Sequence, residues 1–469
     1  MNFKIESGKG VELVLVPENF EGLNVCDETL GYLKESFSPK LGNILTILGP
    51  GKNERVFVGI GKESNLDHLR RAIFAGTKKI IEIKKDMKFS LKKVSSFEKE
   101  DVLKVLVEGA LQATYKFDKY LKKDEDEDER ETTVFIEGAE GLENLVEEYK
   151  NVLEGVFVTR DLVNTPANDM YPEVLANFAK EDLGNLGVNV KVLGKSEIEA
   201  LNMEAFLQVA RGSEKEPKFI IMEYLPVADE KPIMLVGKGL TYDAGGYAIK
   251  PAGSMASMKS DMGGSAAVIG AIHALAKNKV KKNVVGIVAA CENLISGDAY
   301  KNGDIIGSMK GLTIEVVNTD AEGRLTLADA LYYAATKYDG KVIVDLATLT
   351  GACIVGLGMY TTGSVSNCDE NYNKIAKAFE KSGELVWRWP TFEVHREAVK
   401  GTISDLLNSV SGGGGSITAG LFLENFVEER PWVHLDIAGP AFGDSQKGYL
   451  PKGATGVPVK SLYEFVKNY

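Results

Sequence analysis

Short apolar runs alternate with segments of helical periodicity along the first third of this chain of 469 residues. The β-rich runs that predict strands are Val11 to Val16, Asn43 to Leu48, Arg55 to Ile60 and Thr132 to Glu137. The helical patterns are Leu66 to Ile80 and Val102 to Ala113. Because strands and helices alternate, we expect a small N-terminal α/β domain over residues 1–150.

A second, longer series of the same kind follows. A helix from Leu142 to Asn164, stopped by Pro166, is expected to join the two domains. Beyond it, helices are expected to begin at Ser265 and Leu325, and the expected strands are Asn189 to Leu193, Lys218 to Tyr224, Pro232 to Val236, Asn283 to Ala290, Gly311 to Val317 and Lys341 to Leu346. The pattern predicts a larger C-terminal α/β domain, residues 151–469, with a mixed sheet flanked by helices.

The segment Asn318 to Leu325, NTDAEGRL, concentrates charge between a predicted strand and a predicted helix. Asp320, Glu322 and Arg324 recur at every second residue, so an extended backbone would project all three to one face. The carboxyl end of a strand is where open α/β sheets bind their ligands. Taken alone, an acidic pair of this spacing is more often a solvated turn with a helix-capping carboxylate.

An upstream, glycine-punctuated window adds more charged residues. It follows the apolar run Pro232 to Val236 and contains Lys238, Asp243, Lys250 and Asp261. A buried charge is costly unless it is paired or bound to a metal. Two cations that share carboxylates can activate water and polarise a carbonyl. A sensible ligand set for such a pair is the four carboxylates Asp243, Asp261, Asp320 and Glu322.

Three of these stretches, GKGLTYDAGGYAIK, MKSDMGG and NTDAEGRL, together resemble the cytosolic leucyl aminopeptidase family, the dinuclear M17 metallopeptidases. The likeness continues through DLATLTGA, GGSITAGLFLENF and HLDIAG, and it covers the chain from about Arg160 to the end. The resemblance implies an aminopeptidase that removes N-terminal residues from peptides, preferably leucine or other apolar residues. It also implies two divalent metal ions per subunit, Mn²⁺ or Zn²⁺, that activate water.

The resemblance further assigns a role to individual residues. One metal would be held by Lys238, Asp243, Asp261 and Glu322, and the other by Asp243, Asp320 (side chain and backbone carbonyl) and Glu322. A lysine amine that ligates a metal must be neutral, which neighbouring dications favour.

Lys250 would stabilise the oxyanion, and Arg324 would hold a bicarbonate ion that serves as general base. The positions that resemble the family's pocket for the first side chain are Met258, Thr348, Gly351 and Ala438. Tyr242 and Ala244 flank Asp243 where the family usually has Phe and Ser, and Asn302 replaces a usual proline; all ligands are retained. The family also implies a homohexamer.

Composition narrows the range of partners. The formal net charge of −12 gives no reason to expect a nucleic-acid-binding or anionic-membrane surface. Four scattered cysteines, without C-x-x-C spacing, suit a reducing compartment, and no signal peptide or membrane-spanning run is present, so we expect a cytoplasmic enzyme. The charged run Lys122 to Arg130 is expected to be a solvated loop, and all four histidines are expected to be structural.

Two other functions are compatible with parts of the sequence. The carboxylate cluster alone would also suit a two-metal phosphoesterase, although a further Arg, Lys or His clamp for the phosphate is missing from the motifs. A non-enzymatic role as a DNA-binding accessory protein would need a basic surface groove, which the acidic composition does not favour.

Overall fold

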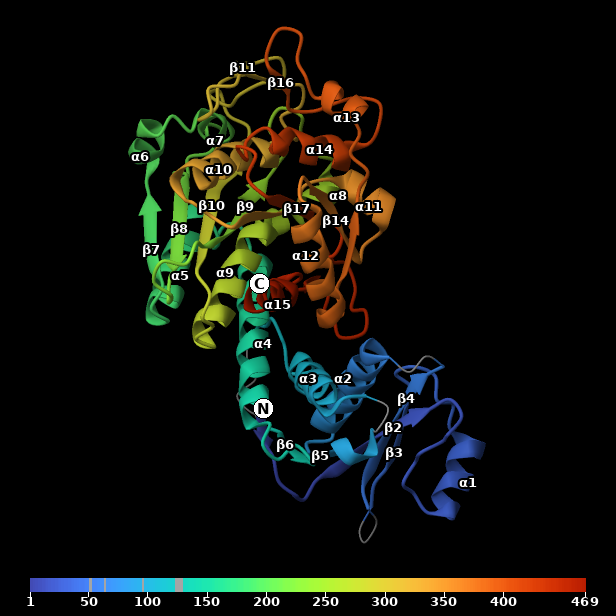
Figure 1. The fold of residues 1–469 in the computed structure, drawn as a ribbon. Helices are drawn as coiled ribbons and strands as arrows, with labels where there is room; N and C mark the ends of the chain where they lie inside the picture. Colours follow the sequence, from blue (N-terminus) through green and yellow to red (C-terminus); the bar gives the residue numbers. More distant parts are fainter. Residues whose placement is uncertain (50–52, 63–64, 95–96, 123–129) are drawn as a thin grey trace. The chain divides into compact units, whose positions relative to one another are not determined.

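The structure is a computed structural model that describes residues 1–49, 53–62, 65–94, 97–122 and 130–469. Its chain divides into two compact units, residues 1–153 with 445–451, and residues 154–444 with 452–469 (Figure 1). Both units are α/β, so the predicted fold class is confirmed. The domain limit at residue 150 stays a prediction, and residues 123–129 of the charged run lie outside the described residues.

The first unit contains a six-stranded sheet in the order β1-β6-β5-β2-β4-β3, in which only β3 pairs antiparallel. Its helices are α1 (Asp27–Ser36), α2 (Leu66–Glu82) and α3 (Lys99–Gln112). Its strands are β1 (Asn2–Lys4), β2 (Val11–Pro17), β3 (Ile44–Ile47), β4 (Arg55–Gly61), β5 (Met87–Ser90) and β6 (Thr133–Glu137). The four-residue strand β5 was missed in the sequence because it is too short for its alternation to stand out.

The second unit is built on an eight-stranded mixed sheet in the order β15-β14-β17-β13-β9-β10-β8-β7. Its strands are β7 (Asn189–Leu193), β8 (Lys218–Tyr224), β9 (Ile233–Asp243), β10 (Val284–Asn293), β13 (Val342–Ala347), β14 (Thr361–Ser366), β15 (Leu385–Arg388) and β17 (Trp432–Asp436). The four central strands β17, β13, β9 and β10 are parallel. Every residue of β10 and β13 is buried, as expected for parallel strands covered on both faces.

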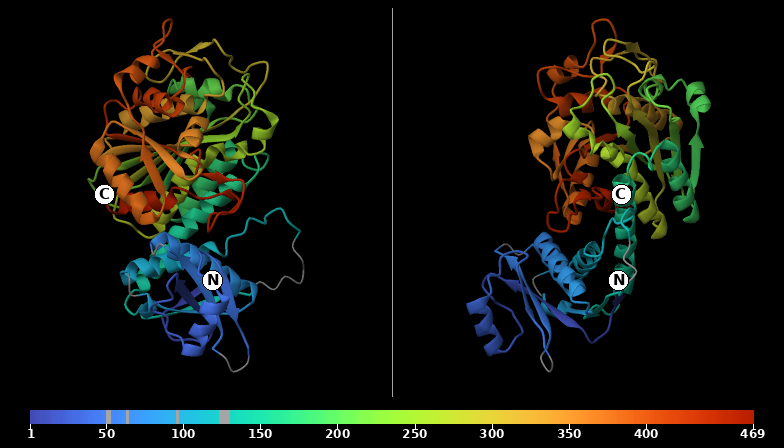
Figure 2. Two further views of the ribbon diagram at one scale, coloured as in Figure 1. Left: turned by 90° about the vertical axis from the view of Figure 1, so that its right-hand side faces the viewer. Right: turned by 180° about the vertical axis from the view of Figure 1, so that it is seen from behind.

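Helices cover both faces of this sheet (Figures 1 and 2). One face carries α5 (Pro172–Asn185), α9 (Gly263–Lys277), α12 (Asp369–Ser382) and α15 (Val459–Lys467). The other carries α7 (Glu204–Ala210), α10 (Gly323–Lys337) and α14 (Gly415–Glu424). The helix α4 (Glu143–Asn164) crosses the boundary between the two units, close to the limits predicted for the connecting helix.

Shorter elements complete the second unit. The helices are α6 (Lys195–Ala200), α8 (Ala252–Met255), the 3₁₀ helix η2 (Met258–Met262), α11 (Gly351–Leu357) and α13 (Glu393–Ala398). The short strands are β11 (Ile305–Ile306), β12 (Ile314–Glu315), β16 (Leu406–Leu407), β18 (Phe442–Gly443) and β19 (Gly453–Ala454). In the first unit, a 3₁₀ turn η1 (Leu91–Lys93) follows β5.

Two details of the predicted metal segment are wrong. The expected strand Gly311 to Val317 contracts to the two residues of β12, and the acidic segment is not extended. Glu322 is the N-cap of α10 with helical dihedral angles, and Arg324 lies in the first turn of that helix. The extended form is lost because the side chain of Asn318 accepts a hydrogen bond from the Asp320 amide at 2.9 Å, which makes a turn.

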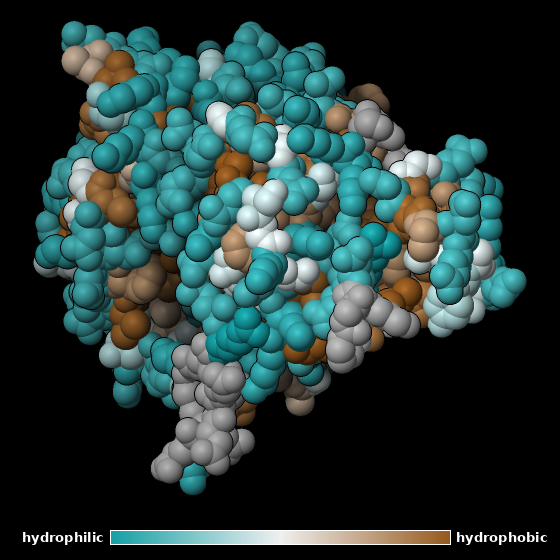
Figure 3. Space-filling view, turned by 90° about the horizontal axis from the view of Figure 1, so that it is seen from below, coloured by the Kyte–Doolittle hydropathy of each residue, from teal (hydrophilic) through white to brown (hydrophobic). Residues whose placement is uncertain are grey.

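No helix among the described residues is long and apolar enough to cross a membrane. The face seen in Figure 3 is mostly hydrophilic, and its apolar side chains form separate patches.

A buried histidine ties α9 to two neighbouring helices in the second unit. His273 shares a hydrogen bond of 2.8 Å with Asp182 on α5, and its second ring nitrogen lies 3.7 Å from Glu154 on α4. Burial lowers the pKa of His273, but the hydrogen bond to Asp182 and the negative charges of Asp182 and Glu154 outweigh it and raise the pKa to about 9. The imidazolium therefore acts as a structural cation, in line with the expectation from the sequence.

We predict that charged His273 stabilises the fold by an amount that depends on pH. Since the folded pKa lies above the ordinary 6.5, this stabilisation is complete below pH 6.5 and is lost as the pH rises to about 9. In metal-free protein, the free energy of unfolding of wild type minus that of His273→Gln should be on the order of 3 kcal/mol in mild acid and shrink toward alkaline pH. Denaturant unfolding at several pH values measures it, and a difference that grows with pH would refute the assignment.

Candidate metal centre

The predicted site forms where the four central parallel strands end. Asp243 is the last residue of β9, Asn293 of β10 and Asp436 of β17, and Thr348 directly follows β13. The carboxyl ends of parallel strands meet at one edge of the sheet, where α/β proteins bind ligands. Strand topology thus collects residues that are up to 193 positions apart, from Asp243 to Asp436, at one place.

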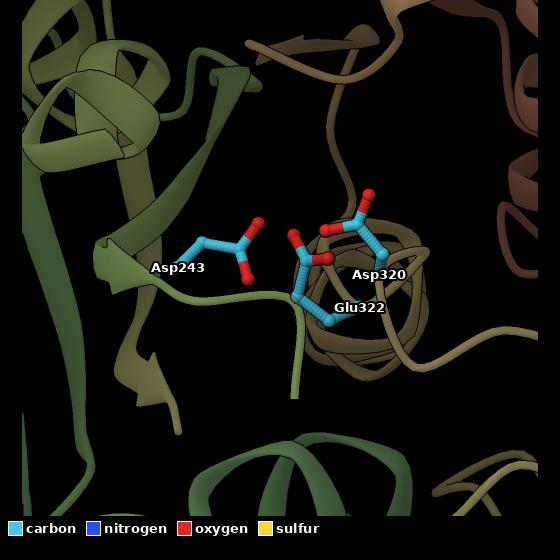
Figure 4. Close-up of side chains that lie close together, drawn as sticks. All are labelled: Asp243, Asp320 and Glu322. Carbon is cyan, nitrogen blue, oxygen red and sulfur yellow. The ribbon is translucent and has the colours of Figure 1, made fainter. Parts of the chain in front are cut away.

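Three carboxylates converge at this edge. Asp243, Asp320 and Glu322 each offer an oxygen within 4.8 Å of the other two, and their side chains point toward one another (Figure 4). Asp243 is carried by β9, whereas Asp320 and Glu322 come from the turn before α10 and its N-cap. Asp243 and Glu322 are each about 1% exposed, so this charge is concentrated away from solvent.

Lys238 and Asp261 complete the inner side of the cluster. Lys238, in the middle of β9, lies 2.8 Å from Asp261 and 3.0 Å from Glu322, and it donates a 3.0 Å hydrogen bond to the carbonyl of Thr348. Asp261 is presented by η2 and accepts a 2.8 Å bond from the hydroxyl of Thr348. All five predicted metal ligands therefore lie in one cluster.

Lys250 closes the outer side. Its ammonium lies 2.7 Å from Asp243 and 2.5 Å from Asp320, and its side chain is 15% exposed. The turn that brings it back passes through Gly245, whose φ of +87° favours glycine. A Cβ at Gly245 would also lie 2.9 Å from a carboxylate oxygen of Asp320. Glycine is thus required for the turn and for the approach of the two ligand segments.

A second close approach involves Gly323, the residue that follows Glu322. A Cβ at Gly323 would lie 2.3 Å from Cε of Lys238. The absence of a side chain at this position lets α10 begin directly against β9. The glycine in NTDAEGRL therefore makes room for Lys238 to reach Glu322.

Burial opposes charge on three carboxylates of the cluster. It raises the pKa of Asp243 and of Asp320, and it raises the pKa of Asp261 to about 8 despite the nearby Lys238. Burial also opposes protonation of Lys238, but Asp261 and Glu322 outweigh it and raise the pKa of this lysine. The cluster is short of positive charge, because four carboxylates face two lysines.

Several oxygen atoms in the cluster lack a hydrogen-bond donor among the described residues. The buried Oε2 of Glu322 has none, and neither does the side-chain oxygen of Asn293. The backbone carbonyl of Asp320 also receives no hydrogen bond from the described part of the chain. Unsatisfied oxygens beside surplus negative charge fit divalent cations, which prefer carboxylate and carbonyl ligands.

Arg324 is buried next to this cluster. Its Nη1 donates a 2.7 Å hydrogen bond to the carbonyl of Asn408, whereas its Nε lacks an acceptor among the described residues. Burial lowers the pKa of Arg324 to about 10, against the pull of Glu322 and Asp436. A buried guanidinium with unused donors is suited to bind a small anion.

Sequence reasoning missed the residues that hold the ligands in place. Asn293 donates to Asp243 at 2.8 Å and to the carbonyl of Thr319 at 3.0 Å, so it links the two ligand segments. The Thr319 hydroxyl donates to the Gly245 carbonyl at 2.7 Å, which makes a second link. No periodicity or charge marks these residues in the sequence.

None of the four histidines, all within the described residues, hydrogen-bonds to a predicted ligand. His434 binds Asp345 at 2.6 Å, and His68 contacts the carbonyl of Ile60. His395 accepts a bond from the Phe392 amide, and His273 pairs with Asp182. The site therefore relies on carboxylates and lysines.

Comparison with known proteins agrees with this geometry. Residues 157–463 match the model of the cytosol aminopeptidase family, catalytic domain, and residues 32–124 match the N-terminal domain of the same family. The chain belongs to the cytosol aminopeptidase family. It is accordingly a metallo-aminopeptidase, a hydrolase of peptide bonds, and the resemblance inferred from its motifs is confirmed.

Individual relatives share nearly the whole chain. A protein of Treponema denticola named "Probable cytosol aminopeptidase" is 49% identical over 99% of this chain and 98% of its own, and one of Clostridium tetani with the same name is 46% identical over 100% and 99%. Among solved structures, a mutant of tomato leucine aminopeptidase is 33% identical, with a TM-score of 0.89 over 100% of this chain and 96% of that chain. The bottromycin maturation enzyme BotP in complex with Mn is 29% identical, with a TM-score of 0.89 over 98% and 99%.

We predict that divalent cations stabilise the protein through this cluster. A ligand that binds only the folded state adds about 2.7 kcal/mol at a concentration of 100 times its Kd. Thermal unfolding of chelator-treated protein should therefore shift upward with added MnCl₂ or ZnCl₂, and Asp320→Asn should lose much of the shift. Asp339→Asn is the control. Asp339 is 60% exposed and precedes β13, so it lies at the amino ends of the parallel strands, whereas the cluster lies at their carboxyl ends. Equal shifts in both variants would place the cations elsewhere.

Proposed function

We propose that the protein removes the N-terminal residue of peptides, with a preference for leucine and other apolar residues, at a centre for two divalent cations. One observation carries the proposal: four carboxylates and Lys238 lie close together, and several oxygens in this cluster lack a hydrogen-bond donor among the described residues. When bound, the cations would activate water and polarise the scissile carbonyl. The chain's own residues then position the substrate and the charges around it.

The proposed ligand sets are those that the family resemblance implies, for residues that lie together in the cluster. Lys238, Asp243, Asp261 and Glu322 would hold one cation, and Asp243, Asp320 and Glu322 the other. The carbonyl of Asp320 receives no hydrogen bond from the described residues, which supports its use as a further ligand. Without a cation the carboxylates favour the ammonium form of Lys238, so ligation requires this lysine to release a proton. Mn²⁺ is a reasonable occupant because BotP was solved with Mn, and Zn²⁺ is the alternative.

Lys250 and Arg324 are the proposed catalytic residues. Lys250 would donate a hydrogen bond to the oxygen that becomes negatively charged when the carbonyl is attacked, which its position at the partly open side of the cluster permits. Arg324 would hold a bicarbonate ion as general base, since its Nε is unused and its environment is buried. No histidine is placed to take this role.

The acidic cluster also explains a preference for the chain end. A peptide carries its α-amine only at the first residue, and this amine would be drawn to the carboxylates of the centre. Met258, Thr348, Gly351 and Ala438 are proposed to surround the first side chain. Thr348 also donates a hydrogen bond to Asp261, so its hydroxyl is directed into the cluster.

We predict metal-dependent hydrolysis of leucine p-nitroanilide. Metal-stripped protein should be inactive and regain activity with Mn²⁺ or Zn²⁺, whereas Asp320→Ala and Glu322→Ala should each lower kcat/KM by at least about 100-fold, because each removes a ligand. The Asp339→Asn variant should retain wild-type activity. Turnover of phosphate esters without turnover of the amide would favour the phosphoesterase alternative instead.

We also propose that the protein assembles as a homohexamer, as the family resemblance suggests, and works in the cytoplasm. Support for an assembly comes from large apolar side chains that are more than 60% exposed in the second unit. They are Val355, Trp387, Phe392, Val394 and Ile403. Exposed apolar groups of this size are typical of surfaces that another chain covers.

Light scattering tests the assembly. We expect a mass six times that of the 50.9 kDa chain. The double substitution Trp387→Ser and Val394→Ser should lower the mass, because it removes apolar area from the covered surface without touching the core. A monomeric mass for the wild type would refute the hexamer and leave the site unaffected.

A further inference from the structure

Asn408 lies beside the acidic segment and is fully buried. It directly follows β16, which pairs in parallel with β12, so these two segments of the chain enter the site side by side. The Asn408 amide extends this ladder by donating a 3.0 Å hydrogen bond to the carbonyl of Glu315. Among the described residues, no strand pairs with the acidic segment beyond this point, and the side chain of Asn408 supplies hydrogen bonds to its backbone instead.

Four hydrogen bonds join this side chain to the backbone of the acidic segment. Its oxygen accepts from the amides of Val317 at 2.8 Å and Asn318 at 3.2 Å. Its nitrogen donates to the carbonyls of Asn318 at 2.7 Å and Ala321 at 3.3 Å. The bonds reach both sides of Asp320, so the backbone around this predicted ligand is held by a single side chain from a distant part of the sequence.

The same residue also holds Arg324. The backbone carbonyl of Asn408 accepts the 2.7 Å hydrogen bond from Nη1 of Arg324. One residue therefore contacts the segment that carries Asp320 and also the guanidinium that is proposed to bind the base. The side chain of Asn408 contacts the segment, and its backbone carbonyl contacts Arg324. A shift of the segment relative to Arg324 would therefore break some of these hydrogen bonds.

Other residues complete the framework around the segment. The Thr319 amide donates to Asn302 at 3.1 Å, and the Thr319 carbonyl accepts from Tyr300 at 2.8 Å and from Asn293. The Ala321 amide donates to the carbonyl of Asn318 at 3.1 Å. Against this background, the carbonyl of Asp320 stands out as free of donors among the described residues. The framework provides hydrogen bonds to the backbone groups on both sides of Asp320 and leaves the Asp320 carbonyl available to a cation.

We propose that Asn408 is a positioning residue that fixes the metal-binding segment relative to Arg324. The inference rests on the proposed function and adds to it a residue outside the ligands and outside the motifs. Asparagine is required because the position must accept two hydrogen bonds and donate two. Aspartate can only accept when ionised, and glutamine would place the amide one carbon further out.

The first test compares Asn408→Ala with a matched control, Asn283→Ala. Asn283 is also a buried asparagine that accepts from the Val227 amide at 3.0 Å and donates to the carbonyls of Val227 at 2.6 Å and Glu230 at 2.8 Å. It precedes β10, whereas Asn293 ends it, so the two lie roughly 33 Å apart. The control thus loses a similar set of hydrogen bonds at the opposite edge of the sheet.

Three readouts separate positioning from general stability. In Asn408→Ala, the Mn²⁺ Kd from calorimetry should rise at least about 10-fold, and kcat on leucine p-nitroanilide should fall about 100-fold while KM changes less than about 3-fold. Hydrogen exchange of the metal-free protein should speed up in the peptide that spans residues 312–325. Asn283→Ala should lower the melting temperature similarly and leave Kd, kcat and this exchange at wild-type values.

The second test uses Asn408→Asp, which keeps the shape of the side chain. Its ionised form faces the carbonyls of Asn318 and Ala321, whereas its protonated form can again donate one hydrogen bond. The ratio of its kcat to that of wild type should therefore rise as the pH is lowered. The corresponding ratio for Asn408→Ala should not depend on pH. This arm remains informative if the alanine variant fails to fold.

Two outcomes overturn the proposal. They are an Asn408→Ala variant whose Mn²⁺ Kd and kcat match those of the control, and a pH-independent ratio for Asn408→Asp. A wild-type protein that binds Mn²⁺ but hydrolyses no peptide would refute the proposed function instead, and the Mn²⁺ and hydrogen-exchange arms would then decide the role of Asn408 alone.

Discussion

The site in the second unit depends on holding four carboxylates close together, of which Asp243, Asp261 and Glu322 are buried and Asp320 is partly exposed. At separations of a few ångströms, like charges repel strongly, and burial adds a desolvation penalty for each of them. Lys238 and Lys250 neutralise part of this charge, and each lysine lies within 3.0 Å of two carboxylates. The remaining deficit of positive charge is the reason we propose that the cluster binds cations, because a fully neutralised cluster would attract them only weakly.

Helix geometry contributes to the same balance. Asp261 lies just before α9, and Glu322 is the N-cap of α10, each a helix of 15 residues. The amino end of a helix carries a partial positive charge, so it favours carboxylates at these two positions. In the chain, α9 follows β9 and α10 leads into β13, and both helices begin beside the carboxyl ends of the parallel strands. Lys238, Asp243 and Glu322 are therefore placed by regular elements, whereas Asp320 lies in the turn before α10.

Much of this could be predicted from the sequence, because the chemistry is concentrated in local motifs. The five proposed ligands and Lys250 fall in three short segments, and the strands and helices around them have clear periodicity. The strand expected over Gly311 to Val317 is shorter in the structure, because among the described residues only Ile314 and Glu315 of this run pair within a strand. Asn293 and Asn408 could not be found, since a buried asparagine bonded to backbone leaves no pattern in its own neighbourhood.

Arg324 shows why the environment of a residue matters as much as its identity. An arginine at this depth would ordinarily be expected to pair with a carboxylate, yet its hydrogen bond goes to the uncharged carbonyl of Asn408. The buried Arg70 in the first unit follows the ordinary pattern, because it lies 2.5 Å from Glu108. Arg70 is paired with a carboxylate, whereas the Nε of Arg324 lacks an acceptor among the described residues and is available to a small anion. The contrast between the two arginines supports the proposal that Arg324 binds a small anion such as bicarbonate.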